Sequence, residues 1–133
     1  MNYSTYVPFG LHIGTRVFTQ IGLIEHVGLV SDYSPWGEPI VMSISQQKGF
    51  VEEPLSEFAK VQGAFRFDYP SKLNSFVVMQ RAYSMARKSY NLANWNCEHF
   101  ASYAHGLPVV SPQVARAATF ALAAIAILAL ARA

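Results

Sequence analysis

The chain has 133 residues, of which 52% are hydrophobic and 14% aromatic, enough for one compact domain with a tail but little for a second domain. Ten Lys and Arg residues against eight Asp and Glu residues give a net charge of +2 with no block of like charge, so the composition does not indicate a nucleic-acid-binding protein. The one cysteine, Cys97, cannot form an intramolecular disulfide, which favours a reducing compartment and the cytoplasmic side of the cell.

The first half of the chain is predicted to form a small antiparallel sheet. Residues 1–10 contain no positively charged region followed by an apolar core, so we expect no signal peptide. Residues 15–33 are rich in β-branched and apolar residues, and residues 39–45 follow after the turn-forming sequence SPWGE, which predicts a β-hairpin. A further short strand is expected at residues 64–67. His26 lies inside the first of these segments.

A first helix is predicted after the sheet. Residues 71–90 are mostly good helix formers. Phe76, Met79, Tyr83 and Ala86 follow one another at spacings of three to four residues and would share one helix face. This pattern indicates a face that packs on the core and gives no sign of a cofactor site.

A second helix is expected to begin near Cys97. It should run to Gly106, where a glycine favours a helix end and Pro108 prevents continuation. Ser111 and Pro112 are typical of the cap and first position of a third helix. A sheet followed by helices indicates an α+β fold.

The end of the chain is an apolar helix in this interpretation. Ala117–Ala131 runs for fifteen residues without charge between Arg116 and Arg132, and its Ala and Leu content favours helix. Fifteen helical residues rise about 22 Å, which is short against a hydrocarbon core of about 30 Å. Two alternatives are open: a marginal membrane anchor with snorkelling arginines, or a helix packed into the core or against a second copy. The chain would divide into a domain at residues 1–110 and this tail at residues 111–133.

Cys97 is the candidate nucleophile. In the first turn of a helix, backbone N–H groups and the helix dipole would lower the pKa of its thiol from about 8.5 towards neutrality. An imidazole would complete the activation. His99 is about 200° around the helix axis from the thiol, His105 is two turns away and His12 precedes the strands, so His26, held on a strand, suits a general base best. The alternative is that Cys97 is a small buried hydrophobic residue.

Two motifs resemble those of the lecithin:retinol acyltransferase-like family. The sequence NCEHF at residues 96–100 resembles the cysteine signature of that family, and HVGLVSD at residues 26–32 resembles its histidine box. The resemblance covers residues 11–114 in the order of the family. It implies that Cys97 is the nucleophile and His26 its base.

The resemblance also implies a fold and an activity. The fold would be a circularly permuted papain-like fold of the NlpC type, with a small antiparallel sheet that carries the histidine and a helix that carries the cysteine. Members of the family attack a phospholipid ester, hold the acyl group as a thioester and pass it to water, an amine or an alcohol. Several members end in a membrane-anchoring helix, so the resemblance implies a phospholipid substrate and a membrane surface as partners.

One position departs from the family pattern. A second histidine is expected on the neighbouring strand, but residues 39–45 contain none. Ser43 or Ser45 would lie on the same face of the sheet as His26, and Ser43 is the preferred residue for orienting the imidazole. A hydroxyl stabilises an imidazolium less well than a charged partner, so turnover is expected to be slow. The alternative is that both serines are ordinary strand residues.

Other chemistries lack their sequence signals. No glycine-rich phosphate loop, no Cys or His pair at metal spacing and no GxSxG motif is present, so we predict neither a metal nor an organic cofactor. Two other functions are retained. One is a cysteine peptidase or amidase of the papain-like superfamily, and the other is a catalytically weak, membrane-tethered interaction module.

Overall fold

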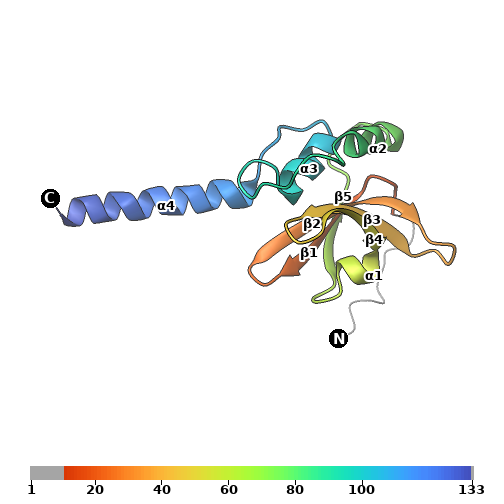
Figure 1. Cartoon of the computed structure of the whole chain (residues 1–133), viewed down its shortest axis with the longest axis horizontal. Helices are drawn as coiled ribbons and strands as arrows, with labels where there is room; N and C mark the ends of the chain where they lie inside the picture. The colour runs from red at the N-terminus through yellow and green to blue at the C-terminus, as the bar shows by residue number, and fades with distance from the viewer. Residues whose placement is uncertain (1–10, 133) are drawn as a thin grey trace.

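The computed structural model describes residues 11–132, so the first ten residues, over which no signal peptide is predicted, lie outside the described part (Figure 1). The strands are β1 (Arg16–Ile21), β2 (Ile24–Tyr33), β3 (Pro39–Ser45), β4 (Gly49–Pro54) and β5 (Ala64–Asp68). The helices are α1 (Leu55–Phe58), α2 (Ser75–Ser84), α3 (Cys97–Ala104) and α4 (Pro112–Ala131).

The five strands form one antiparallel sheet in the order β4-β3-β2-β1-β5. The α+β class and the antiparallel sheet are therefore confirmed, whereas the circular permutation and the papain-like topology stay a prediction. The predicted hairpin of residues 15–33 with residues 39–45 corresponds to β2 and β3. Residues 15–33 are nevertheless two strands, because a two-residue turn at Gly22 and Leu23 reverses the chain.

The sheet has a different hydrophobic core on each face, because successive side chains of a strand point to opposite sides. Helices α2 and α3 cover one face, as Figure 1 shows, and the core beneath them is centred on Val27, Leu29 and Phe100. On the other face the short helix α1 brings Leu55 and Phe58 against β-strand valines. Neighbouring residues of β2 therefore belong to different cores.

Helix α2 is shorter than predicted and buries another stripe. Its buried residues are Val78 and Ala82, whereas Phe76 is 70% exposed and Tyr83 is 48% exposed. The predicted stripe is therefore wrong, although Met79 does pack against the core. The reason is a rotation about the helix axis: Val78 and Ala82 form an i,i+4 pair on the adjacent face, and small side chains there allow close packing on α3.

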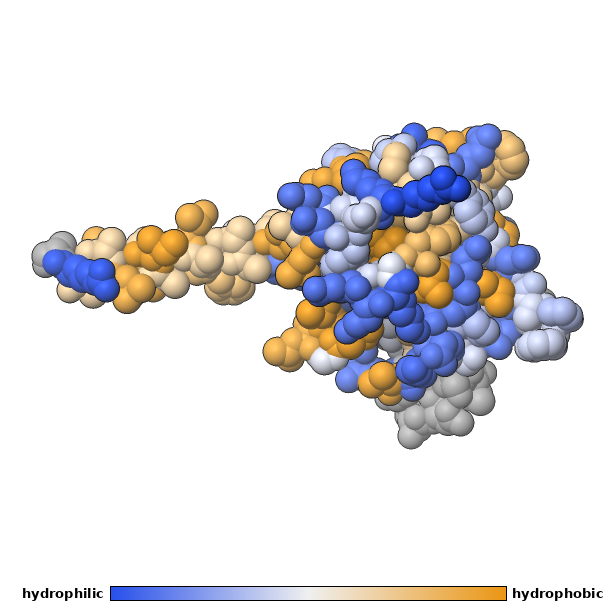
Figure 2. Space-filling model, in the orientation of Figure 1, coloured by the Kyte–Doolittle hydropathy of each residue, from blue (hydrophilic) through white to orange (hydrophobic). Residues whose placement is uncertain are grey.

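Helix α4 extends away from the domain, and Figure 2 shows it as a projecting hydrophobic rod. Ser111 caps it by accepting a hydrogen bond from the Val114 N–H at 3.3 Å, and Pro112 is its first residue, as predicted. None of its 20 residues is buried, so packing into the core of this domain is excluded. It is the one helix of the described residues that is long and apolar enough to cross a membrane.

Candidate active site

The predicted nucleophile begins a helix, as the sequence indicates. Cys97 is the first residue of α3, and the side-chain oxygen of Asn96 accepts hydrogen bonds from the backbone N–H groups of Glu98 (2.9 Å) and His99 (3.3 Å). In return the Nδ1 atom of His99 accepts from the backbone N–H of Asn96 at 3.0 Å. This reciprocal capping box fixes the chain around Cys97 and uses His99 as a structural residue.

The start of α3 is also joined to the start of α4. A carboxylate oxygen of Glu98 accepts a hydrogen bond from the Ser111 hydroxyl at 2.5 Å and from the Gln113 backbone N–H at 3.3 Å. The Asn96 side-chain amide donates to the same Ser111 hydroxyl at 3.1 Å. The residues on either side of Cys97 therefore hold the root of the apolar helix.

The thiol of Cys97 is buried against strand β2. Burial raises the pKa of the Cys97 thiol to about 11, although the backbone N–H groups of Val27, Glu98 and Cys97 lie close enough to the sulfur to favour the thiolate in part. The phenol of Tyr90 is near enough that a charge on the sulfur would raise the pKa of Tyr90 further. Burial thus outweighs the helix dipole, and the depressed thiol pKa predicted from the helix start is wrong. The resting group is a neutral thiol.

His26 lies next to Val27 in the chain, but its ring points to the other face of the sheet. There it stacks on the Phe58 ring of α1, with 5.0 Å between ring centroids and 28° between planes. Gly28 leaves room for this packing, since a Cβ atom at Gly28 would lie 3.1 Å from the Phe58 ring and 2.4 Å from Val41. Among residues 11–132, no hydrogen bond joins the imidazole of His26 to the thiol of Cys97.

The environment of His26 keeps its ring neutral. Burial is the main cause that lowers the pKa of the His26 imidazole, and the Glu53 carboxylate opposes this while the Lys48 ammonium adds to it. Glu53 is itself buried and accepts a hydrogen bond from Lys48 at 2.8 Å. At neutral pH the site therefore holds a thiol and a neutral imidazole, which is a base able to accept a proton.

Ser43 and Ser45 lie where the hairpin register places them. Both line the same cavity as His26, which has a volume of about 220 Å³ and lies on the α1 face of the sheet. The Ser43 hydroxyl is buried and has no hydrogen-bond partner among the described residues. The Ser45 hydroxyl accepts from the Lys48 backbone N–H at 3.0 Å. Ser43 is therefore the serine whose hydroxyl is left for another partner.

The remaining histidines are placed outside this site. His105 is buried, with its ring nitrogens 2.6 Å from the Ser71 hydroxyl and 2.7 Å from the Gly14 carbonyl oxygen. His12 lies in a turn, as expected, where its carbonyl oxygen accepts from the Thr15 N–H. No group of three or more His, Cys, Asp or Glu side chains in the described residues could hold a metal ion.

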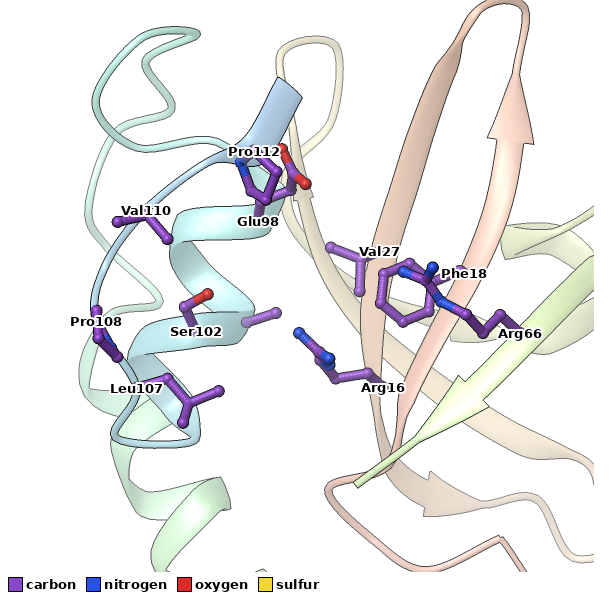
Figure 3. A pocket seen from close by; sticks show the side chains of 11 residues that line it. Arg16, Phe18, Val27, Arg66, Glu98, Ser102, Leu107, Pro108, Val110 and Pro112 are labelled. Atoms are coloured by element: carbon purple, nitrogen blue, oxygen red, sulfur yellow. The ribbon is translucent and has the colours of Figure 1, made fainter. Parts of the chain in front are cut away.

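A second cavity, of about 370 Å³, lies between α3 and the sheet (Figure 3). Val27 and Phe18 line it from the strands, and Leu107 and Val110 line it from the segment that follows α3. Arg16 also lines it, but its guanidinium is occupied by the Asp68 carboxylate at 2.6 and 2.7 Å. The lining is thus mainly apolar. Cys97 is not part of it, but Glu98, the next residue in the chain, and Val27, against which the sulfur packs, are.

Sequence reasoning missed the residues that set the state of the imidazole. Phe58 and Glu53 lie on elements that were not predicted, the helix α1 and the strand β4. Glu53 was detectable only as a charge in a segment without a clear pattern, and no signal in the sequence indicates that Phe58 stacks on a histidine. Tyr90 precedes the asparagine-rich turn, and nothing in its spacing indicates a place near the thiol.

Comparisons with models of known families, with curated proteins and with solved structures give no match for this chain.

Proposed function

We propose that the protein is a thiol-dependent acyltransferase or acyl hydrolase that takes its acyl group from a lipid ester at a membrane surface. The observation that carries this proposal is the position of Cys97, whose sulfur at the start of α3 lies against the backbone of Val27, the residue after His26. The NCEHF and HVGLVSD motifs, which resemble those of the lecithin:retinol acyltransferase-like family, support the same activity.

The chemistry begins from two neutral groups. In the structure the imidazole of His26 lies on the α1 face of β2 and the thiol of Cys97 lies on the α3 face, so a rotation of the side chain alone cannot bring them together. The proposed mechanism therefore requires β2 to shift around His26 so that the ring reaches the α3 face and accepts the thiol proton. The thiolate sulfur then adds to the ester carbonyl carbon. The backbone N–H of Cys97, which takes no part in the capping box, would donate a hydrogen bond to the resulting oxyanion. When the carbon–oxygen bond of the ester breaks, the leaving alkoxide takes the proton from the imidazolium, and the acyl group stays on sulfur as a thioester.

The second half of the reaction releases the acyl group. Water or an amine attacks the thioester carbonyl while the His26 imidazole accepts its proton. The carbon–sulfur bond then breaks, and the thiolate of Cys97 takes that proton back, which restores the neutral thiol and the neutral imidazole. Transfer to an amine gives an amide, and transfer to water gives a fatty acid. No metal or organic cofactor enters either step.

Two polar residues would support the imidazole while it is charged. The Glu53 carboxylate already favours the protonated ring of His26, so it would stabilise the imidazolium. The Ser43 hydroxyl shares the cavity of His26 and would accept its second N–H. Ser43 is therefore a positioning residue in this proposal.

A lipid ester is favoured as the substrate for two reasons. The cavity of about 370 Å³ beside Val27 is lined mainly by apolar side chains, which suit an acyl chain. Helix α4, of 20 residues and about 30 Å in length, would hold the domain at the cytoplasmic face of a bilayer. The acyl donor would then be a phospholipid of that bilayer.

The test is an acyl adduct on the intact protein. Full-length protein is incubated with phospholipid vesicles and weighed by mass spectrometry, beside the Cys97→Ala variant. We expect a mass increment of one acyl group that hydroxylamine removes and that Cys97→Ala does not form. If lipids leave no adduct while peptide or amide substrates are cleaved with Cys97 required, the protein is a cysteine peptidase or amidase instead.

One observation favours a second candidate, a membrane-tethered interaction module. The imidazole of His26 stacks on Phe58 instead of facing Cys97, and burial holds the thiol neutral. A protein without catalytic activity would keep the imidazole of His26 away from the thiol of Cys97 whether or not substrate is present. In that case no lipid, peptide or amide substrate labels Cys97, and an electrophile still reacts with it slowly in the presence of substrate vesicles.

A further inference from the structure

The turn between β1 and β2 presents apolar side chains where hairpins usually present polar ones. Ile21 pairs with Ile24, and Gly22 and Leu23 form the two-residue turn between them. Gly22 has a φ of +60°, which fits a tight hairpin turn with glycine at its first central position. Leu23 is 99% exposed, and Ile21 and Ile24 are 50% and 58% exposed. The turn geometry needs only the glycine and does not explain the three large apolar side chains.

The neighbouring strand extends this surface. β5 pairs with β1 next to the turn, with Ala64 opposite Thr19. Val61, just before β5, is 69% exposed, and Phe65 is 52% exposed. We call the five exposed side chains at this edge the apolar sheet end: Ile21, Leu23, Ile24, Val61 and Phe65. Exposed apolar side chains gathered at one end of a sheet indicate an apolar partner.

The apolar sheet end is fixed beside the root of α4. The Gln113 side chain accepts a hydrogen bond from the Glu25 N–H and donates one to the Glu25 carbonyl oxygen, both at 3.0 Å. Glu25 follows Ile24 of the hairpin directly, and Gln113 is the second residue of α4. In Figure 1 the β1–β2 hairpin points towards the side from which α4 leaves the domain, and Figure 2 shows hydrophobic residues at its end.

The position of Arg116 gives the depth of this surface relative to a bilayer. Arg116 is exposed and precedes the uncharged part of α4, so in a membrane it would lie at the level of the lipid headgroups. Gln113 precedes Arg116 by three residues, which is about 4.5 Å along a helix axis. The hairpin bound to Gln113 is therefore at headgroup depth. Lys60 and Arg66, both at least half exposed, lie beside it, although Lys60 pairs with Glu57 at 2.8 Å and Arg66 lies 3.7 Å from Glu25. Either cation would have to exchange its carboxylate partner for an anionic headgroup.

We propose that the apolar sheet end rests on the bilayer that α4 enters, with Leu23 inserted at the boundary between headgroups and acyl chains. This inference depends on the membrane attachment in the proposed function and is independent of the chemistry at Cys97. It has a consequence for that site, because Ile21, Lys60 and Val61 also line the cavity of His26. The docked sheet end brings lipid headgroups to the rim of that cavity on the α1 face, whereas the thiol of Cys97 lies on the α3 face.

The first test measures depth with a fluorophore on the full chain. In a Cys97→Ala background, Leu23→Cys is labelled with an environment-sensitive dye and mixed with phosphatidylcholine–phosphatidylserine vesicles. The matched control is Trp36→Cys, because Trp36 is 79% exposed in the β2–β3 turn at the other end of the sheet. We expect emission at position 23 to rise several-fold and to be quenched by brominated lipids, and emission at position 36 to stay unchanged.

Three results would overturn the proposal. If the protein floats with the vesicles while the dye at position 23 stays in water, α4 is the whole anchor. If the protein does not float, the membrane attachment fails as well. If emission at position 23 rises with protein concentration in the absence of lipid, a second copy of the chain covers the sheet end. None of these results depends on the acyl adduct, so the chemistry stands or falls separately.

The second test uses activity. Leu23→Glu is expected to float with vesicles through α4 and to lose about tenfold in turnover of vesicle phospholipid, because a buried charge opposes docking. Its turnover of a soluble short-chain ester should equal that of the unchanged protein. Trp36→Glu is the control and should alter neither rate. Equal loss on the soluble ester would show a damaged fold and would count against the proposal.

Discussion

The two faces of β2 carry the two halves of the candidate site in unlike surroundings. On the α3 face, Cys97 packs into the larger core, and burial raises the pKa of its thiol to about 11. On the α1 face, His26 stacks on Phe58 beside a cavity that also holds the charges of Glu53 and Lys48. The thiol is thus enclosed by apolar side chains, whereas the imidazole borders a cavity that charged side chains also line.

The thiol of Cys97 and the imidazole of His26 lie close along β2 and yet make no contact. Successive residues of a strand point to opposite faces, so His26 and Val27 are adjacent in the chain but only the second faces α3. Each surrounding favours the neutral form of its own group. In the proposed function, the nucleophile is therefore activated only when substrate is bound, and the resting neutral thiol is less open to oxidation than a thiolate would be.

Substitution of His26 should have a large effect on the rate of thioester formation and none on the rate at which the resting thiol of Cys97 is alkylated. His26→Ala should lower the rate of thioester formation about 10²- to 10⁴-fold, which is the usual contribution of a general base. The alkylation of Cys97 by iodoacetamide without lipid should not change, because the imidazole faces away from the thiol at rest. His12→Ala, in an exposed turn, is the control for both rates. A parallel loss of alkylation in His26→Ala would mean that the two groups are already in contact.

A smaller effect concerns the packing of the α1 face. Phe58 is 5% exposed, so Phe58→Ala should reduce the free energy of unfolding by about 3 kcal/mol through lost burial and a cavity. Phe76→Ala, at a residue 70% exposed, should cost less than about 0.5 kcal/mol. Urea unfolding measures both.

The Phe58→Ala variant should also change the pKa of the His26 imidazole. Burial is the main cause that lowers the pKa of His26, so removing the Phe58 ring should raise that pKa towards its usual range, as NMR titration would show. An unchanged pKa in Phe58→Ala would mean that another residue buries the imidazole. The two faces would then be less distinct than the structure indicates.

Much of the fold and part of the site could be predicted from the sequence. The helix start at Cys97, the cap at Ser111 and the hairpin of β2 with β3 follow from local rules, since capping residues and strand patterns act over a few positions. The β1–β2 turn was missed because Gly22 and Leu23 lie inside a run of apolar residues that reads as one strand.

The electrostatic state of the site could not be predicted in the same way. A helix start favours a thiolate, but the burial of Cys97 depends on contacts between α3 and β2, which are distant in the sequence. The direction of the His26 ring likewise depends on α1, a helix of four residues with no sequence pattern of its own. Long-range packing decides both, and local patterns carry no information about it.

The pH dependence of alkylation should distinguish the thiol from an ordinary one. A thiol with a pKa of about 11 has about 300-fold less thiolate at pH 7 than a free cysteine with a pKa of about 8.5. Because the folded-state pKa is raised, the alkylation rate of Cys97 should rise about tenfold for each pH unit between 7 and 10. A rate that is already constant near pH 7 would indicate a preformed thiolate and imidazolium pair, and the separation of the two faces would be wrong.

Substitution of Ser43 and Ser45, both on β3, should cause only small changes in the free energy of unfolding. Ser43 is buried with no hydrogen-bond partner among the described residues, so Ser43→Ala should stabilise the protein by up to about 1 kcal/mol. Ser45→Ala should destabilise it by about 0.5 to 1 kcal/mol, because the Ser45 hydroxyl accepts from the Lys48 N–H. Urea unfolding of the two variants should therefore shift in opposite directions.

The turnover of the Ser43→Ala and Ser45→Ala variants tests whether Ser43 positions the imidazole of His26. A hydroxyl that serves only the charged imidazole adds nothing to stability at rest, so Ser43→Ala should lower turnover several-fold while it stabilises the fold, and it should move the acidic limb of the pH–rate profile. Ser45→Ala should leave that profile unchanged. If Ser43→Ala changes neither the rate nor the profile, the hydroxyl is an ordinary buried residue, and Glu53 alone remains to stabilise the imidazolium of His26. The α1 face would then act on the ring through the charge of Glu53 and not through a hydrogen bond.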